Sequence, residues 1–399
     1  MNKKRKTVSL AGSVAAALAA MTLTTGTAFG QAVPGGTLDP LSIPKYVTPL
    51  VIPPVMSNSG TTNDYDIAVR QFKQLILPAG FAASTVWSYG PAGEDRDAVA
   101  ALTAPSPASQ FNYPAYTIEA TKDAAITVDW VNDLVDPATG KYRPHLLPID
   151  RSLHWANPEG IPCDVGKIKD CRPDPTALRD PTILFEPYDG PVPIVVHVHG
   201  AHVGPESDGY PEAWWLPDAN NIPGDYSTVG TLVNNYAFNT NNAPGIASFR
   251  YPNDQPSTTL WYHDHTLGMT RNNVYAGPAG FWLIRDDENE GGETGLISGT
   301  LPGPAPVAGQ DVLSLNVPGE AVRASIREIP IVIQDRSFND DGSLFYPANR
   351  AFFEGLGDGQ DSGGNANNRA GLKIDFVGED GKGKKSPSDI APIWNPEAF

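Results

Sequence analysis

The residues of this sequence best suited to metal chemistry are its histidines. The chain has only seven, and five of them lie between His197 and His265. They include two pairs, His197 with His199 in HVHG, and His263 with His265 in WYHDH. One such pair is weak evidence for a metal site, because a histidine on a strand is more often a packing or surface residue. Two pairs in a chain with seven histidines are much stronger evidence.

Both pairs fall in segments that we predict to be β-strands. Residues 191–199 (PVPIVVHVH) are apolar and β-branched, and residues 257–265 (STTLWYHDH) are similar. Successive strand side chains alternate between faces, so both imidazoles of a pair point the same way, with Cα atoms about 7 Å apart. Two such strands side by side would surround one space with four imidazoles. Imidazole ligates copper, zinc, nickel and iron. We therefore predict a metal site made by these four histidines.

The other candidates have simpler interpretations. His202 extends the first pair to HxHxxH, as in metallo-β-lactamases, but the Asp-His step of that motif is absent. We expect His202 to lie in a loop or to support the site from outside. The residues to which we assign surface or packing roles are His145, His154, Met269, Trp214, Trp215 and Trp261.

Composition predicts an all-β fold. The chain has 399 residues, with 39 glycines, 39 prolines and only 18% charged residues, which suits a turn-rich β protein and excludes helical bundles and coiled coils. Ile126, Val128 and Trp130 alternate with polar residues, as in a half-buried strand. Residues 279–285 and 329–334 predict further apolar strands. Short strands between Gly- and Pro-rich turns indicate a Greek-key sandwich.

Charge and the N-terminus define the compartment and the partners that we expect. The formal net charge is −17, and such a surface repels phosphate backbones and anionic lipids, which excludes nucleic-acid binding. Residues 3–6 are basic and residues 10–23 are apolar, which predicts a signal peptide over residues 1–32, cleaved after Gly30 or Ala32. The apolar run is too short to span a membrane. We expect a secreted or periplasmic protein that is not held in a membrane, and no protein partner is evident.

The chain has two cysteines, Cys163 and Cys171, separated by seven residues. In an oxidising compartment this arrangement favours a disulfide that closes a short loop. A pair of metal thiolates is the rival interpretation, but the spacing fits no common zinc knuckle.

Composition also divides the chain. After the signal peptide we expect a first domain over residues 33–286, which begins with a Pro-rich arm. Residues 287–320 contain the Pro/Gly-rich run GTLPGPAPVAG and predict a linker. Residues 321–399 would form part of a second domain. They include a turn at residues 339–342 and a mobile loop over residues 354–386. About 80 residues are few for a complete sandwich, so we expect a truncated chain.

Several of these motifs resemble the multicopper oxidases, in particular the group of bacterial spore-coat laccases, bilirubin oxidases and phenoxazinone synthases. The similarity runs from about residue 40 to the end of the sequence. It is carried by HVHG with SDGYPEAW (residues 207–214), LWYHDH (residues 260–265) and TRNNVYAGPAG (residues 270–280). Supporting segments are residues 85–90, 116–119 and 147–150, while residues 333–336 and 342–347 resemble the opening of the family's second domain.

The resemblance implies tandem cupredoxin-like Greek-key domains, of which this chain would hold the first complete, the second in part and the third not at all. In that family a trinuclear copper cluster lies between domains one and three. His197 would then ligate the type 2 copper, and His199, His263 and His265 the type 3 pair. Asp208 resembles an acidic residue that helps to move protons during O₂ reduction. Equally, Asp208 could simply cap the Ser-Asp-Gly turn.

The sequence also departs from the family pattern. The remaining cluster ligands and the type 1 copper ligands lie in HxxHxH and HCHxxxH motifs, and neither occurs here. The resemblance therefore implies half of a trinuclear site and no blue copper. The function we predict is a laccase-like copper oxidase, incomplete and inactive as given. It would take single electrons from phenols, aminophenols, bilirubin-like molecules or metal ions and reduce O₂ to water.

Two alternatives remain at this point. The four histidines could form a mononuclear zinc hydrolase or a cupin-like site, with Glu206 or Asp208 as ligand or general base. The chain could instead be an inert copper-binding fragment. Metal analysis and oxidation of a phenolic dye distinguish these alternatives.

Overall fold

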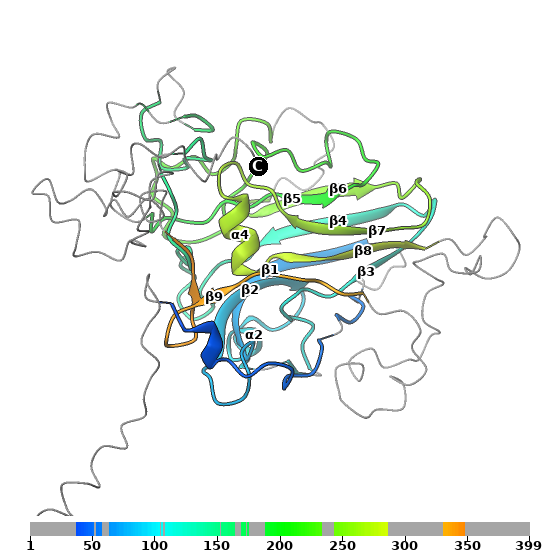
Figure 1. Cartoon of the computed structure of the whole chain (residues 1–399). Coiled ribbons are helices and arrows are strands. Elements are labelled where there is room, and N and C mark those ends of the chain that lie inside the picture. Colours follow the sequence, from blue (N-terminus) through cyan, green and yellow to red (C-terminus); the bar gives the residue numbers. More distant parts are fainter. Residues whose placement is uncertain are drawn as a thin grey trace, which may run out of the picture.

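The computed structural model describes a fold made almost entirely of β-strands, shown in Figure 1. The described residues are 37–51, 53–57, 64–103, 105–106, 108–151, 153–163, 169–172, 174, 188–233, 243–285 and 330–347. Two four-stranded sheets form the body, and a two-stranded hairpin lies beside them. This is the all-β sandwich that the composition predicts. The helices are short: the 3-10 turn η1 (Pro40–Ser42), α2 (Arg96–Ala100) and α4 (Thr270–Ala276).

The first sheet has the strand order β2-β1-β4-β6. Its strands are β1 (Asp64–Gln74), β2 (Ser84–Pro91), β4 (Ile126–Asn132) and β6 (Ile246–Tyr251). β1 runs antiparallel to β2 and parallel to β4, which in turn runs antiparallel to β6. In β4 the buried and half-buried residues alternate, as we predict for this segment.

The second sheet has the strand order β3-β8-β7-β5 and carries the histidine pairs. Its strands are β3 (Ile118–Thr121), β8 (Ala279–Arg285), β7 (Thr258–Asp264) and β5 (Val196–His199). β8 is buried along its whole length. β5 has four residues and pairs only with β7, so it is an edge strand of this sheet.

Large aromatic side chains fill the space between the two sheets. Tyr89 of β2 and Trp130 of β4 pack against Tyr262 of β7, with ring centroids 5.3 and 5.7 Å apart. Further along, Tyr251 of β6 packs on Trp282 of β8 at 4.7 Å. Because aromatic side chains bury large areas, this layer fixes how the two sheets face each other. Within this layer Trp130 donates a hydrogen bond to the Tyr251 hydroxyl, 3.1 Å away.

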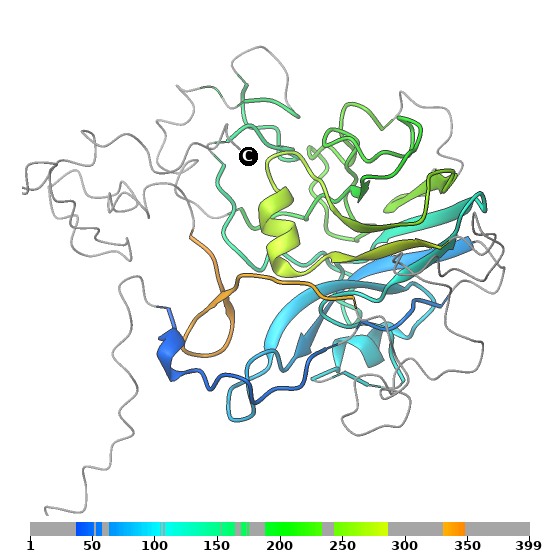
Figure 2. The same cartoon turned by 45° about the vertical axis from the view of Figure 1, so that its right-hand side comes forward.

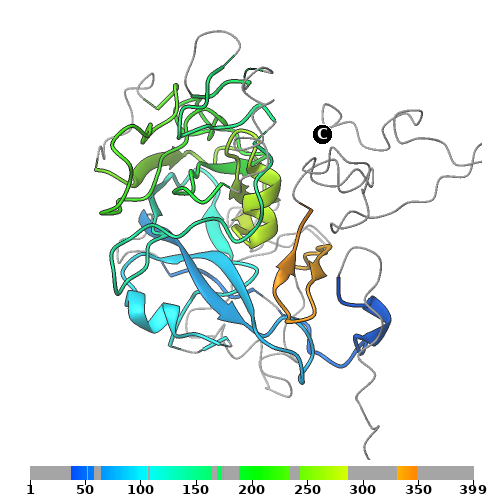
Figure 3. The same ribbon diagram turned by 90° about the vertical axis from the view of Figure 1, so that its left-hand side faces the viewer.

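α4 stands across one end of the sheets, and the hairpin packs beside it (Figures 2 and 3). β9 (Ser337–Phe338) and β10 (Leu344–Phe345) form this hairpin around the turn that we predict at residues 339–342. Arg336 lies over the ring of Tyr275, 4.5 Å from its centroid, and donates to the carbonyl of Val274. The amide of Ser337 donates to the Tyr275 hydroxyl at 2.6 Å. The end of α4 is therefore fixed to the hairpin.

The prediction of an apolar strand over residues 329–334 is wrong where the structure describes it. Residues 330–334 have no strand pairing, and Ile333 is 93% exposed. An apolar run forms a strand only when another strand offers its backbone, and the described residues supply no such partner here.

Several sequence predictions lie outside the described residues. They are the signal peptide, the linker, the loop over residues 354–386 and most of the second domain, so the number and bounds of the domains remain predictions. Within the described part of the chain, no helix is long and apolar enough to cross a membrane.

Candidate metal centre

The pairing of β5 with β7 brings the two histidine pairs together. His197 lies directly opposite His263, and His199 lies opposite Trp261. Because residues opposite each other share a face, and residues two apart along a strand share it too, these side chains all project from one face of the sheet. Val196, Val198 and Tyr262 point to the other face, where they are buried in the core.

The four imidazoles converge, as the sequence predicts. The ring centroid of His197 lies 5.6 Å from that of His199, 5.6 Å from His263 and 5.1 Å from His265. His263 is also 5.7 Å from both His199 and His265. Rings this close leave room for metal ions between them but little else.

Backbone carbonyls fix the protonation of two rings. His197 Nδ1 lies 2.5 Å from the carbonyl oxygen of Asp208, and His263 Nδ1 lies 2.7 Å from that of Asp264. A carbonyl oxygen can only accept, so each Nδ1 carries the proton and each Nε2 keeps a lone pair. This is the arrangement in which a neutral imidazole ligates a metal through Nε2.

The other two rings, those of His199 and His265, are not hydrogen-bonded to a backbone carbonyl of another described residue. His199 Nδ1 lies 3.4 Å from His263 Nε2, a long contact between two groups that both suit a metal. His265 Nδ1 is buried, and no described residue forms a hydrogen bond with it. A buried polar atom without a partner is costly unless a ligand satisfies it.

Burial also favours the neutral form of two of the four rings. It lowers the pKa of His263 to about 4, a shift that the neighbouring histidines reinforce and the Asp264 carbonyl opposes. Burial lowers the pKa of His265 as well, with His197 adding to the effect. Metal ligation needs deprotonated imidazole, so both shifts favour binding of a cation near neutral pH.

Asp208 lies beside His197. Besides the carbonyl contact, its carboxylate Oδ1 lies 3.4 Å from His197 Nδ1, and its side chain is partly exposed. The next residue, Gly209, has φ of +77°, so Asp208 also occupies the turn that the alternative interpretation assigns to it. The contact with His197 orients the ring; a role in moving protons remains a prediction.

Gly209 cannot carry a side chain. A Cβ at this position would lie 2.1 Å from the carbonyl oxygen of Val196, and the positive φ disfavours any L-residue. We expect Gly209→Ala to lower the free energy of unfolding by about 1–3 kcal/mol and to weaken metal binding, because β5 must move. Chemical denaturation and metal titration check this. Gly224→Ala is the control, since a Cβ there meets nothing within 4 Å; equal losses in both variants would contradict the explanation.

Trp261 belongs to the site, although the sequence predicts only a packing role for this residue. It is 40% exposed, stacks on His199 at 5.4 Å and lies 4.1 Å from the ring of His263. Its position two residues before His263 on a strand places it on the histidine face, and this period-two spacing was the signal available in the sequence.

The remaining candidates lie away from the cluster, as predicted. His202 is exposed, and its ring binds Asp254 at 2.8 Å. His145 contacts Asn273 and packs on Trp87. The residues buried in the core are Met269, Trp214 and Trp215.

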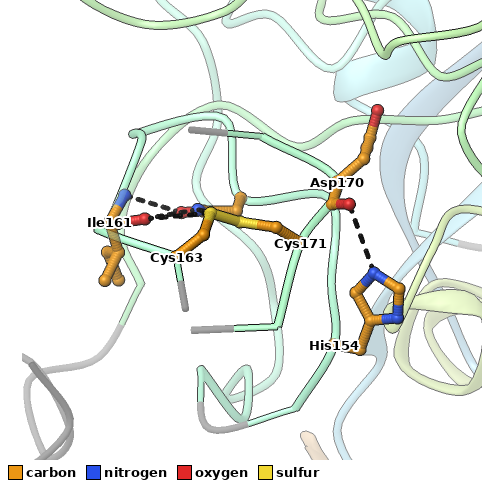
Figure 4. Close-up of a disulfide and its surroundings, with 6 residues drawn as sticks. His154, Ile161, Cys163, Asp170 and Cys171 are labelled. Atoms are coloured by element: carbon orange, nitrogen blue, oxygen red, sulfur yellow. Dashed lines mark hydrogen bonds between the residues drawn. A yellow bond between two sulfur atoms is a disulfide. The ribbon is translucent and has the colours of Figure 1, made fainter. Parts of the chain in front are cut away.

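Cys163 and Cys171 form the predicted disulfide, with Cα atoms 5.9 Å apart (Figure 4). Close to it, His154 Nε2 lies 3.2 Å from the carbonyl oxygen of Asp170. Asp170 itself accepts hydrogen bonds from the buried Trp214 and from the amide of Thr231. Both cysteines are therefore used in the bridge, which leaves no thiolate among the described residues to bind a metal.

The donor set suits a metal but does not complete a site. Among the described residues, no group of three or more His, Cys, Asp or Glu side chains is arranged as it would be around one ion. Four converging imidazoles, one with a buried atom that lacks a partner, fit metals that take further ligands from elsewhere.

Comparison with known proteins shows similarity to laccases. No family model matches the chain. It is 28% identical to a laccase of Bacillus stratosphericus over 77% of its length, and 29% identical to a laccase of Haloferax volcanii over the same share. The chain is therefore a relative of the multicopper oxidases.

The relatives that the chain matches are longer than the chain. It covers 41% of the Bacillus laccase and 37% of the Haloferax laccase, about two fifths of each. The multicopper oxidase McoA of Aquifex aeolicus aligns with 75% of the chain and 38% of its own length, at 16% identity and a TM-score of 0.35. A likeness that distant carries no argument about activity.

Proposed function

We propose that this chain supplies half of the trinuclear copper site of a laccase-like oxidase. The observation that supports this is the convergence of four imidazoles from β5 and β7, with Nδ1 of His197 and of His263 bonded to carbonyls. His197 would hold the type 2 copper, and His199, His263 and His265 the type 3 pair, as the resemblance assigns.

Bound copper would supply the one-electron steps that couple oxidation of a phenol, aminophenol, bilirubin-like molecule or metal ion to reduction of O₂ to water. The chain's own residues orient the imidazoles. The Asp208 carboxylate, partly exposed beside His197, would hold and pass protons. The type 1 copper and the other cluster ligands would come from polypeptide outside these 399 residues. We also propose export, because a signal-like segment opens the chain.

The zinc alternative is weaker. A mononuclear zinc site holds three or four protein ligands around one ion, and the described residues offer no such group. A copper site shared with other polypeptide accounts for the convergence of the histidines without requiring three ligands on one metal.

A titration of the purified chain with Cu²⁺ and Zn²⁺ tests the proposal. We expect bound Cu²⁺ with nitrogen ligation by electron paramagnetic resonance, no blue band and no oxidation of a phenolic dye. The blue band needs a thiolate ligand, and both cysteines are in the disulfide. Bound Cu²⁺ without histidine ligation would contradict the site, and dye turnover by this chain alone would contradict its assignment as half a cluster.

A further inference from the structure

Asp264, the middle residue of the HDH motif, points away from the histidines and is fully buried. Its carboxylate accepts hydrogen bonds from the amide of Val195 at 3.2 Å and the amide of Thr266 at 3.0 Å. Asn273 Nδ2 donates at 2.8 Å, and the Thr266 hydroxyl lies 3.0 Å away. Only donors surround this carboxylate, and no described Lys or Arg forms an ion pair with it.

These donors belong to the segments that carry the histidine pairs. Val195 precedes His197 by two residues, and Thr266 follows His265. The carbonyl of Val195 in turn accepts from the amide of His265 at 2.8 Å. Both backbone groups of Val195 are therefore bonded to the HDH motif.

β5 needs such a bond. It is a four-residue edge strand with one neighbour, so few ladder hydrogen bonds fix its register. A slip of one residue would turn His197 and His199 to the opposite face of the sheet. The bond from Asp264 to Val195 lies just before the first residue of β5 and opposes that slip.

Asn273 holds Asp264 in place. It lies on α4, is 1% exposed, and also donates to the carbonyl of Pro193 at 3.1 Å. Because Asn273 Nδ2 faces two acceptors, Oδ1 is the atom that faces His145, and His145 Nε2 donates to it at 3.0 Å. The network thus sets the amide orientation of Asn273, with its donor facing Asp264.

We propose that Asp264, held by Asn273, is a positioning residue that sets the register of β5 against β7 and hence the spacing of the four histidines. Its effect on copper rests on the proposed function, whereas its effect on β5 does not. An amide in place of the carboxylate would direct an N–H group at other donors. We expect Asp264→Asn to weaken Cu²⁺ binding about 10- to 100-fold, as loss of supporting partners does at other metal sites.

The test compares four variants of the full chain: Asp264→Asn, Asn273→Asp, the double variant, and Asp133→Asn. Asp133 is the control, a buried carboxylate that bonds Arg70 in the other sheet. One readout is hydrogen exchange of the metal-free protein in peptides covering residues 194–199 and 263–267, measured at low temperature. The other is titration with Cu²⁺ followed by electron paramagnetic resonance.

We expect faster exchange confined to these two peptides and weaker Cu²⁺ binding for Asp264→Asn and Asn273→Asp. Asp133→Asn leaves the buried Arg70 charge without its partner, so it should raise exchange throughout the chain and leave the Cu²⁺ affinity of the folded protein unchanged. Asn273→Asp places two carboxylates together, and the double variant restores a donor between them. The double variant should therefore bind Cu²⁺ more tightly than Asn273→Asp alone, a rescue that general destabilisation would not produce.

Wild-type exchange in Asp264→Asn, or an equal loss of Cu²⁺ affinity in folded Asp133→Asn, would overturn the positioning role. If the wild-type chain binds no Cu²⁺, the proposed function fails. In that case the exchange readout still decides the role of Asp264.

Discussion

Replacing His263 with alanine should lower the affinity of the chain for Cu²⁺ by about 100-fold or more, the upper end of the loss that supporting residues alone cause. His263 is central to the cluster, since its ring lies within 5.7 Å of the other three imidazoles. Its Nδ1 is bonded to a carbonyl, so Nε2 is available as a ligand. Titration with Cu²⁺, followed by calorimetry or electron paramagnetic resonance, measures the loss.

His202→Ala is the matched control for that variant. His202 is close in sequence to the first histidine pair, but its side chain is 76% exposed and paired with Asp254. We expect its removal to leave Cu²⁺ affinity unchanged within about twofold, as for a surface substitution. Binding by His263→Ala that equals the wild type, or an equal loss in His202→Ala, would show that the four-histidine cluster is not the copper site.

The convergence of the histidines could be predicted because it depends on a local rule. Residues two apart on a strand share a face, so the spacing in HVHG and WYHDH already orients each pair. The fold class followed from composition in the same way, and β4 and β8 follow their alternating and continuous apolar patterns. Each of these features depends on the residue pattern within a short segment of the chain.

The features that could not be predicted depend on contacts between distant segments. The register that sets His197 opposite His263 joins residues 66 positions apart, and no local pattern specifies it. The bond from Val195 to Asp264 spans 69 positions. The apolar residues 330–334 show the converse case, since their local pattern predicts a strand that the described residues do not complete. Strand formation there depends on a partner that the pattern cannot reveal.

The ion pair between Arg70 and Asp133 should give the largest stability effect in the described fold. Both side chains are buried, and Arg70 Nε lies 2.6 Å from Asp133 Oδ2. Arg70 also donates to the carbonyls of Glu94 and Ala92, each at 2.7 Å, so it joins β1 to the segment after β2. We expect Arg70→Met to lower the free energy of unfolding by about 3–5 kcal/mol, the cost of leaving a buried charge without its partner. Urea denaturation followed by circular dichroism measures it.

Arg96, which is largely exposed, is the other partner of Asp133 and compensates only in part for the lost guanidinium. Adding Asp133→Asn to Arg70→Met removes the stranded charge, so the double variant should lose less stability than the sum of the two single variants. Arg143→Met is the control. Its pair with Asp136 is partly exposed, and its loss should cost less than about 1 kcal/mol.

Because Arg70 lies in the first sheet and the histidines lie in the second, folded Arg70→Met should bind Cu²⁺ as the wild type does. A loss below 1 kcal/mol, or a loss of Cu²⁺ affinity in the folded variant, would show that this ion pair does not act as a purely structural support.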